Sequence, residues 1–387
     1  MVKFHWLCYA LILTLFCCKK PFNPKVISSA NSYLVVEGVI NSGNDSTIIK
    51  LSRTVKLDGQ TTTNPVLNAT VTVEGDKGGS FPLSDINGKG NYGAVGLNLP
   101  ATQNYRLKIE TANNQYVSDF IAVKQTPPID SINYVIKDGV LNLYVNAHDP
   151  QSATHYYRWS YNETWIFHSK YRSYFVVDPL TNTMVPRQDS QQIYYCFGNH
   201  ASSNILLTNT SKLSSDLVYE SPLTQIPVTS EKLEVKYSIL VTQYALTGEA
   251  YNFYQNIKKT TENLGSIFDA EPTQISGNIH NVANPGEPVI GYISVTNVQS
   301  KRIFISNSVI PNILPIYPYE CEQDTALLVN KNGFNEVQNT LINPPPSYLP
   351  TQGLFAPGGS IYGYLYSSSQ CVDCTIRGTT QTPPFWQ

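Results

Sequence analysis

The chain has 387 residues, of which 41% are hydrophobic and 14% are charged, against roughly 25% charged residues in an average soluble domain. Its 26 basic and 28 acidic side chains leave a formal net charge of −2. This balance excludes the basic footprint of a nucleic-acid-binding protein and the polybasic patch that binds an anionic membrane surface. The hydrophobic content excludes global disorder.

The residue types indicate a β-rich, exported protein. The chain contains 26 Tyr, 14 Phe, 25 Pro and 23 Gly, but only 2 Met. Aromatic residues favour strands, and Pro and Gly favour the turns between strands. The composition therefore predicts a mainly β fold, and the length suggests two or three domains.

The first 17 residues are predicted to be a signal peptide. Lys3 supplies a basic start, and the apolar stretch at residues 7–16 is shorter than the roughly 20 residues of a membrane-spanning helix. The sequence LFCC at residues 15–18 resembles a bacterial lipobox, in which a small residue precedes an acylated cysteine. We expect Cys18 to carry the lipid and to begin a polar tether over residues 18–30. A plain secretion signal with incidental cysteines is the alternative.

Four further cysteines are predicted to form two disulfides: Cys196, Cys321, Cys371 and Cys374. An even number of cysteines in an oxidising compartment favours disulfides, and four cysteines leave three pairings open. Cys371 and Cys374 match a redox CxxC motif, but that motif requires a βαβ context that is missing here. We expect structural bonds that hold residues 343–359, whose five Pro and three Gly are poorly suited to a regular strand ladder.

Residues 31–124 are predicted to form an immunoglobulin-like β-sandwich. Apolar and polar residues alternate over 69–74 and 105–110, which is typical of half-buried antiparallel strands. Turn clusters separate about seven such runs. The sequence GKGNYG at residues 88–93 matches GxGxxG, but no helix pattern follows it, so we expect a β-hairpin turn and not a dinucleotide site.

Residues 125–387 are predicted to form a larger β-rich domain with a disulfide-stapled tail. It starts with a rigid linker at residues 125–128 (QTPP). Strand alternation returns at 141–145 and 156–165. One main helix is expected, with Thr247 as its N-cap and Gly265 as the glycine at its end. The apolar stripe between them consists of Tyr251, Tyr254, Ile257 and Leu264.

The sequence completes none of the catalytic motifs that we considered. GGSIY at residues 358–362 breaks the GxSxG pattern, and HExxH is missing. His148, Asp149 and His155 could meet at a metal across a hairpin, but ordinary polar loop residues explain them better. Glu320, Glu322 and Asp324 could bind calcium, but without a Gly-punctuated loop we expect a solvated acidic turn. We therefore expect no enzyme, no metal and no cofactor.

One aromatic segment is a candidate binding surface. Residues 168–175 (HSKYRSYF) place Tyr171, Tyr174 and Phe175 among two basic side chains. Exposed aromatic rings can bind sugars or protein partners, so these three residues are the candidate ligand-binding residues. Ordinary sheet packing is the alternative for them, and it is the expectation for the tyrosines of 316–320 and 361–366.

A series of short motifs spans essentially the whole mature chain. The motifs are YYCF at 194–197, NT at 209–210, KLEVKYSILVTQY at 232–244, LTGEAYN at 246–252, TENLGSIFDAEP at 261–272, GNI at 277–279, EPVIGY at 287–292, and CVDC, RGT and PFW between 371 and 386. In this order they resemble the Bacteroidetes lipoproteins grouped as domain of unknown function 4249. The resemblance implies an outer-membrane lipoprotein that is typically encoded beside a TonB-dependent receptor, with no assigned catalytic residues. Lys19 and Lys20 stand where acidic residues often accompany surface export, so both leaflets of the outer membrane are kept as alternatives.

These observations predict a non-enzymatic lipoprotein that its lipid anchors to the outer membrane, on the cell surface or in the periplasmic leaflet. We expect it to be an accessory subunit of a TonB-dependent transporter system for nutrient uptake, with no nucleic-acid partner. A free-standing surface lipoprotein that binds a glycan or a peptide is the alternative. An enzyme is the third hypothesis, and it would require His148, Asp149 and His155 to cluster around a pocket.

Overall fold

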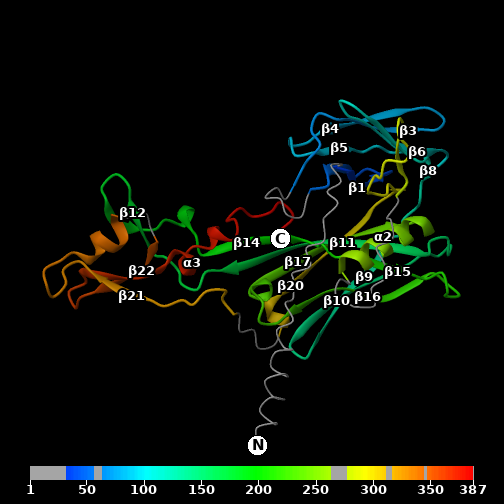
Figure 1. The fold of residues 1–387 in the computed structure, drawn as a ribbon. Coiled ribbons are helices and arrows are strands. Elements are labelled where there is room, and N and C mark those ends of the chain that lie inside the picture. Colours follow the sequence, from blue (N-terminus) through cyan, green and yellow to red (C-terminus); the bar gives the residue numbers. More distant parts are fainter. Residues whose placement is uncertain (1–31, 56–62, 263–276, 311–315, 344–346, 387) are drawn as a thin grey trace, which may run out of the picture.

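The computed structural model describes residues 32–55, 63–262, 277–310, 316–343 and 347–386. It confirms the predicted fold class, because this part of the chain is mainly β, with several sheets and one main helix. Figure 1 shows an N-terminal β-sandwich, a central β body, and an arm that extends from the body. The predicted signal peptide, Cys18 and the tether lie outside the described residues. No helix among the described residues is long and apolar enough to cross a bilayer.

The N-terminal sandwich is one continuous ladder of strands bent into two layers. Strand β4 pairs with β3 over residues 80–83 and with β5 at Ser84 and Asp85, so the ladder changes layer within this strand. The predicted alternation is confirmed, since Val71 and Val73 are buried between polar neighbours. In ladder order the strands are β18 (Ile279–Asn281), β7 (Gln115–Ser118), β6 (Asn104–Glu110), β3 (Thr70–Gly75), β4 (Ser80–Asp85), β5 (Asn91–Val95), β2 (Ser46–Arg53), β1 (Leu34–Asn41) and β19 (Val295–Thr296), with β8 (Ile121–Ala122) beside β6.

The GxGxxG match forms the turn of the β4–β5 hairpin, as predicted. Gly88 and Gly90 have φ angles of +65° and +76°, which favour glycine. A Cβ atom on Gly90 would lie 2.5 Å from the carbonyl oxygen of Leu51. Backbone conformation and close packing explain these glycines without a bound phosphate.

Two short strands from much later in the chain complete this sandwich. β18 pairs antiparallel with β7, and β19 pairs parallel with β1. Ile279, Val289 and Ile293 are buried in the same hydrophobic core as the first strands. The sandwich predicted for residues 31–124 therefore also contains residues 277–298, which were expected in the second domain.

The central body packs two sheets around an aromatic core. One sheet contains β9 (Ile129–Lys137), β10 (Val140–His148) and β16 (Leu217–Pro227). The other contains β14 (Tyr195–Ala201), β11 (Tyr156–His168), β17 (Lys236–Ala245) and β20 (Gln299–Ser306), with β15 (Leu206–Asn209) beside β11. The inward side chains of β11 include Tyr157, Trp159, Tyr161, Trp165 and Phe167, all of which are buried in one cluster.

The main helix, α2 (Gly248–Glu262), begins where the sequence predicts. The Thr247 hydroxyl accepts a hydrogen bond from the Ala250 amide at 3.2 Å, which is the expected N-cap. The rings of Tyr251 and Tyr156 lie 5.1 Å apart, so the helix packs on β11. The last expected stripe residue, Leu264, and the expected helix end at Gly265 lie outside the described residues.

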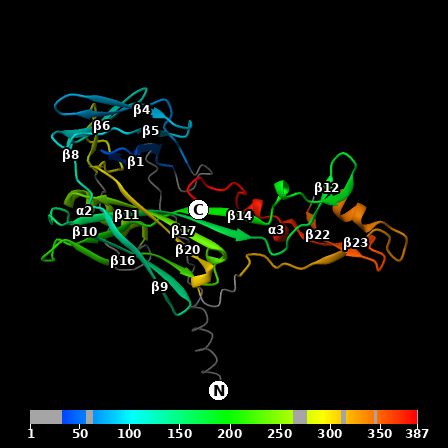
Figure 2. The ribbon, with the colours of Figure 1, turned by 180° about the vertical axis from the view of Figure 1, so that it is seen from behind.

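The arm is built from two excursions of the chain, residues 169–194 and 316–374, and Figure 2 shows it from behind. Strands β21 (Asp324–Leu327), β23 (Ile361–Ser368) and β22 (Tyr348–Phe355) form its sheet. The hairpin β12 (Phe175–Asp178) and β13 (Thr183–Pro186), and the helical turns η4 (Gln338–Ile342) and α3 (Ser369–Val372), pack around that sheet.

The Pro- and Gly-rich stretch 343–359 was expected to be poorly suited to a regular ladder, and part of it nevertheless forms the strand β22. It pairs as an edge strand, with register shifts after Pro350 and after Leu354. An edge position tolerates proline because the missing N–H is not needed there, and the Pro350 carbonyl accepts a hydrogen bond from the Ser173 hydroxyl at 2.7 Å.

The predicted linker at residues 125–128 is fixed between the sandwich and the body. The hydroxyl oxygens of Thr126 and Thr296, a residue of β19, lie 2.7 Å apart. The Pro127 carbonyl accepts a hydrogen bond from Nε2 of Gln243 at 2.7 Å, and the Gln243 side chain is fully buried. The linker is thus a buried polar junction between the two units.

We predict that Gln243→Leu destabilises the protein by roughly 2–6 kcal/mol. Gln243 Oε1 accepts a hydrogen bond from the Trp159 indole at 2.9 Å. The substitution would leave that N–H and the Pro127 carbonyl buried without partners, at about 1–3 kcal/mol each. Denaturant unfolding of the full chain measures the loss. Gln225→Leu, on the exposed face of β16, is the matched control and should stay within about 0.5 kcal/mol of the wild type. Equal midpoints for the two variants would contradict the proposed junction.

Candidate functional site

Two disulfides close the base of the arm. Cys196 of β14 is bonded to Cys374, and Cys321 is bonded to Cys371. The prediction of two structural disulfides is confirmed, and the structure selects one of the three pairings. Cys371 and Cys374 have different partners, so they do not form a redox CxxC pair. We call the region around these four cysteines the arm root.

Hydrogen bonds reinforce the arm root. The Tyr171 amide donates to the Cys371 carbonyl at 3.0 Å, and the Tyr171 hydroxyl donates to the Cys321 carbonyl at 3.0 Å. The Cys374 amide donates to the Ile193 carbonyl at 2.9 Å. Tyr171 therefore links the first excursion of the chain to both ends of the second.

A buried carboxylate of the body holds both entrances to the arm. Nε2 of His168, the last residue of β11, lies 3.1 Å from Oε1 of Glu234. The Tyr317 hydroxyl donates to the same oxygen at 3.1 Å. Burial and the neighbouring carboxylate raise the pKa of Tyr317, which keeps its phenol protonated as a donor.

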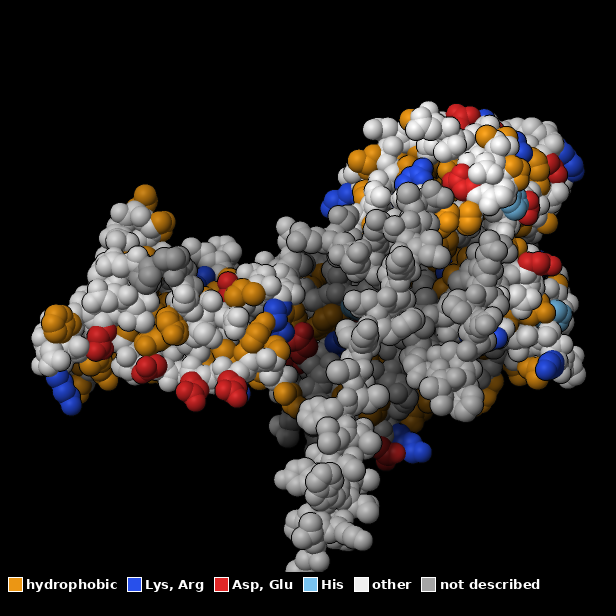
Figure 3. Space-filling view, viewed as in Figure 1, with side chains coloured by type: hydrophobic (Ala, Val, Ile, Leu, Met, Phe, Trp, Pro, Cys, Tyr) orange, Lys and Arg blue, Asp and Glu red, His pale blue; other side chains and the backbone are white. Residues whose placement is uncertain are grey.

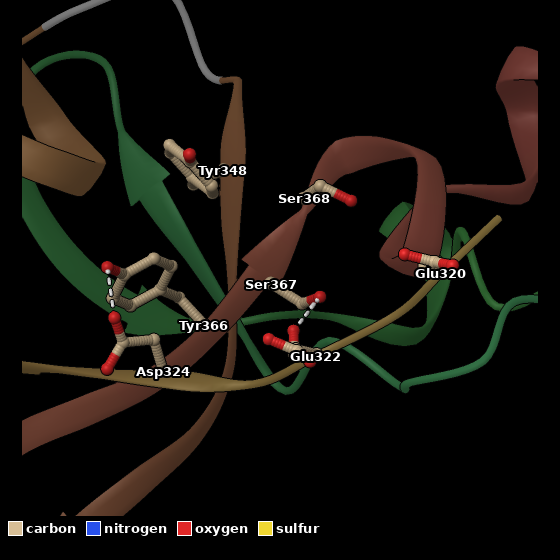
Figure 4. Close-up of a pocket in the computed structure, with 7 residues that line it drawn as sticks. All are labelled: Glu320, Glu322, Asp324, Tyr348, Tyr366, Ser367 and Ser368. Carbon is tan, nitrogen blue, oxygen red and sulfur yellow. Dashed lines mark hydrogen bonds between the residues drawn. The ribbon is translucent and has the colours of Figure 1, made fainter.

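Beyond the root, the arm carries a groove of about 370 Å³, shown in Figure 4. One wall comes from the segment that leads into β21, and the other walls come from β22 and β23. We call this feature the acidic groove. Its lining residues are Glu320, Glu322, Asp324, Tyr348, Tyr366, Ser367 and Ser368.

The strand register places two tyrosines in the acidic groove. Tyr366 of β23 lies opposite Asp324, and Tyr348 of β22 lies opposite Ser368. The two rings meet edge to face, with centroids 5.3 Å apart. The Tyr366 hydroxyl donates to Oδ2 of Asp324 at 3.3 Å, and burial together with this carboxylate raises the pKa of Tyr366. Tyr348 remains 44% exposed, so its ring is accessible from solvent.

Three carboxylates give the groove its charge. Glu320, Glu322 and Asp324 are exposed and alternate with Cys321 and Gln323, whose side chains are engaged elsewhere. Among the described residues, no Lys, Arg or His forms an ion pair with any of the three. Figure 3 shows acidic side chains along the lower margin of the arm. The negative charge of the groove is therefore not compensated within the described chain.

These groups are suited to recognition of a polar ligand. Carboxylates accept hydrogen bonds from hydroxyl and ammonium groups, and a tyrosine ring offers an apolar face with a polar edge. No group of three or more His, Cys, Asp or Glu side chains in the described chain is arranged to hold a metal ion. The carboxylates and the tyrosine rings of the groove offer direct contacts to a ligand with hydroxyl or cationic groups.

The three aromatic residues predicted for ligand binding do not form one surface. Tyr171 is engaged in the arm root, and Phe175 packs edge to face on Tyr364 at 5.1 Å. Tyr174 is about half exposed and lies beside Arg172. It lines a separate hollow of about 280 Å³ with Arg172, Ser173, Arg187, Gln188, Asp189 and Gln192. Of the three residues, Tyr174 is the one that faces solvent at a hollow.

The side chains of His148, Asp149 and His155 each have a different environment. Nδ1 of His148 lies 2.7 Å from Oδ2 of Asp130, a contact that raises the pKa of His148. The Asp149 carboxylate accepts hydrogen bonds from the amides of its own turn, at Gln151, Ala153 and Thr154. Nδ1 of His155 is buried without a hydrogen-bond partner in the described chain. The three side chains do not converge on a metal site or on one of the hollows described above.

Sequence reasoning missed the acidic groove. Tyr366 was expected to pack in the core, and Tyr348 lies in the stretch that was expected to be poorly suited to a regular ladder. The acidic residues were expected to form a solvated turn, whereas they line a groove against the arm sheet. Their spacing of two residues just before a strand was the available signal, because it places all three on one side of an extended chain.

We predict that the double variant Cys321→Ser/Cys371→Ser loosens the arm without unfolding the body. Loss of a disulfide of this kind typically costs about 2–5 kcal/mol, so amides of β21, β22 and β23 should exchange at least about 30-fold faster. Hydrogen-exchange mass spectrometry measures this rate, with the amides of β11 and β17 in the same molecule as the internal control. Unchanged exchange in the arm would show that its hydrogen bonds suffice without this disulfide.

Comparisons with known proteins identify a family. The model described as Domain of unknown function (DUF4249) matches residues 19–302. None of the curated proteins matches the chain. The chain is similar to a crystal structure from Bacteroides uniformis ATCC 8492, named "putative carbohydrate binding protein", with a TM-score of 0.15 and 9% sequence identity, over 56% of this chain and 90% of that chain. Because the family model covers well over half of the chain, the protein belongs to the DUF4249 family.

Proposed function

We propose that the protein is a non-enzymatic lipoprotein of the outer membrane that assists a TonB-dependent transporter in nutrient uptake. The observation that carries the proposal is the acidic groove on a disulfide-tied arm that extends from the body. A site on such an arm is accessible to a large partner or to a ligand that a partner receives. The predicted lipobox, with Cys18 as the acylated cysteine, supports the proposed location in the outer membrane.

The charge of the groove indicates the chemistry of its ligand. Three carboxylates without an ion-pair partner among the described residues attract amines and polarised hydroxyl groups, and they repel phosphate and carboxylate ligands. The exposed ring of Tyr348 adds an apolar contact in the same groove. A basic loop of a transporter or a cationic nutrient would match this combination.

A second function is favoured by the pair of tyrosines. Tyr348 and Tyr366 lie beside carboxylates, and this combination also suits a sugar ring, which presents hydroxyl groups at its edge and C–H groups on its face. The alternative proposal is therefore a free-standing surface lipoprotein that binds a glycan or a peptide in the same groove.

The proposed anchor gives the first test. Cys18→Ser should release the protein into the soluble fraction after cell lysis, because the lipid would be the main membrane attachment. Fractionation and immunoblotting measure the distribution, and Cys17→Ser is the matched control that should stay with the membrane. A Cys18 variant that remains fully membrane-bound would contradict the lipid anchor at this residue.

Co-purification tests the role of the groove. The full-length protein, tagged at its C-terminus and extracted in mild detergent, should bring down a TonB-dependent receptor in stoichiometric amounts. Glu320→Gln/Glu322→Gln/Asp324→Asn should reduce its recovery at least about tenfold, a change of about 1.4 kcal/mol, because charge complementarity would be lost. The control Glu37→Gln/Asp45→Asn/Glu110→Gln removes three exposed carboxylates of the sandwich and should change little.

Two results would redirect these proposals. Equal loss of the receptor in both triple variants would show that general charge, and not the groove, mediates the contact. If the protein elutes alone, glycan and peptide arrays test the second function, and Tyr348→Ala should then weaken binding at least about tenfold. Array binding that survives Tyr348→Ala would place the ligand outside the groove.

A further inference from the structure

The free end of the arm presents a surface that the acidic groove does not use. It consists of two turns, residues 328–334 after β21 and residues 355–362 between β22 and β23, which we call the arm tip. The turns are neighbours, because the Leu328 amide donates to the Tyr362 carbonyl at 2.9 Å. Phe355 lies opposite Ile361 in the sheet register.

Four large apolar or aromatic side chains of the arm tip are exposed. The exposed fractions are 71% for Val329, 63% for Phe334, 60% for Phe355 and 48% for Tyr362. They come from turns that lie side by side at one end of a three-stranded sheet. Figure 3 shows hydrophobic side chains at this end of the arm. Exposed apolar groups gathered in this way typically mark a contact surface.

The turns themselves are well held by hydrogen bonds. Oδ1 of Asn330 accepts from the amides of Asn332 and Phe334, at 2.9 and 3.0 Å. The Ala356 amide donates to the Ser360 carbonyl at 2.9 Å. The apolar side chains are therefore displayed by ordered turns, and their exposure is a property of the fold.

The charges of the arm are segregated. Lys331 is the one charged residue in the two turns. The nearby Glu336 is turned back onto the arm, where it accepts hydrogen bonds from the Asn330 side chain and the Leu327 amide. The uncompensated carboxylates lie in the acidic groove, toward the arm root. The tip thus combines apolar side chains with a single positive charge.

We propose that the arm tip inserts into a lipid surface, with Phe334, Phe355 and Val329 in the acyl boundary and Lys331 among the phosphate groups. Aromatic and aliphatic side chains on turn tips lower their free energy in the interfacial region of a bilayer, and a lysine extends its charge to the head groups. The charge of Lys331 complements phosphate. The inference goes beyond the proposed function and does not depend on a lipid at Cys18.

Brominated lipids test the insertion on the full-length protein. Phe355→Trp places a fluorophore at the tip, and Phe120→Trp, at an exposed phenylalanine of the sandwich, is the matched control. Each variant is mixed with vesicles of phosphatidylethanolamine and phosphatidylglycerol that contain dibromo-phosphatidylcholine. We expect Phe355→Trp to show a blue shift when vesicles are added. The fraction of its fluorescence that the brominated lipid quenches should be at least about twice the fraction quenched in the wild type, whose native tryptophans give the background. Phe120→Trp should show neither change.

Lys331→Glu in the Phe355→Trp background tests whether the charge of Lys331 contributes to binding of the lipid phosphate groups. It should weaken binding to anionic vesicles several-fold, without an effect on folding, because Lys331 is exposed on a turn. No quenching of Phe355→Trp, or equal quenching of both tryptophan variants, would overturn the proposal. A blue shift that depends on protein concentration without vesicles would also overturn it, since it would assign the tip to contacts between proteins.

Discussion

The two disulfides at the arm root are the constraint on which the candidate site depends. The arm has a small core, with Ala326, Val337, Leu341 and Tyr364 as its buried cluster in the described chain. Units with so little buried apolar surface need covalent links or contacts to a larger body. Cys196–Cys374 joins the arm to β14 across 178 residues, and Cys321–Cys371 closes the second excursion on itself. The acidic groove is lined by residues on both sides of Cys321 and by residues shortly before Cys371, so the bond that stabilises the arm also ties two walls of the groove together.

Strand β11 connects this root to the rest of the molecule. A strand of 13 residues spans about 40 Å. Near its start, Trp159 contacts Gln243 and through it the linker, and at its end His168 contacts Glu234, the buried carboxylate of the body that also binds Tyr317. Between them, the fully buried carboxylate of Glu163 is satisfied by the Lys232 ammonium at 2.7 Å and the Tyr237 hydroxyl at 2.8 Å. A buried charge with specific partners favours one strand register over its neighbours. The body therefore acts as a rigid support that relates the sandwich to the arm.

Local patterns in the sequence predicted the parts of this fold that depend on local chemistry. The alternation of 69–74 and 105–110, the Gly88 turn and the Thr247 cap are each decided by a few adjacent residues, and each is confirmed. β18 and β19 have three and two residues, too few for a visible period, and they join the sandwich through contacts with distant strands. The acidic groove was missed for the same reason. Tyr348, Asp324 and Tyr366 are distant in sequence, and strand pairing in the arm brings them together.

The arm separates two kinds of chemistry that would interfere with each other if they were mixed. A carboxylate next to an exposed apolar side chain would have to lose its water when that side chain enters an apolar environment. This loss would raise the free energy of the transfer. Here the carboxylates face the acidic groove near the root, while Glu336, the acid beside the tip, is held by Asn330 and by the Leu327 amide, and its pKa is lowered by these hydrogen bonds. The backbone of β21 and β23 joins the two regions. An arm arranged in this way can make an apolar contact at its end and keep a polar groove open to solvent behind it.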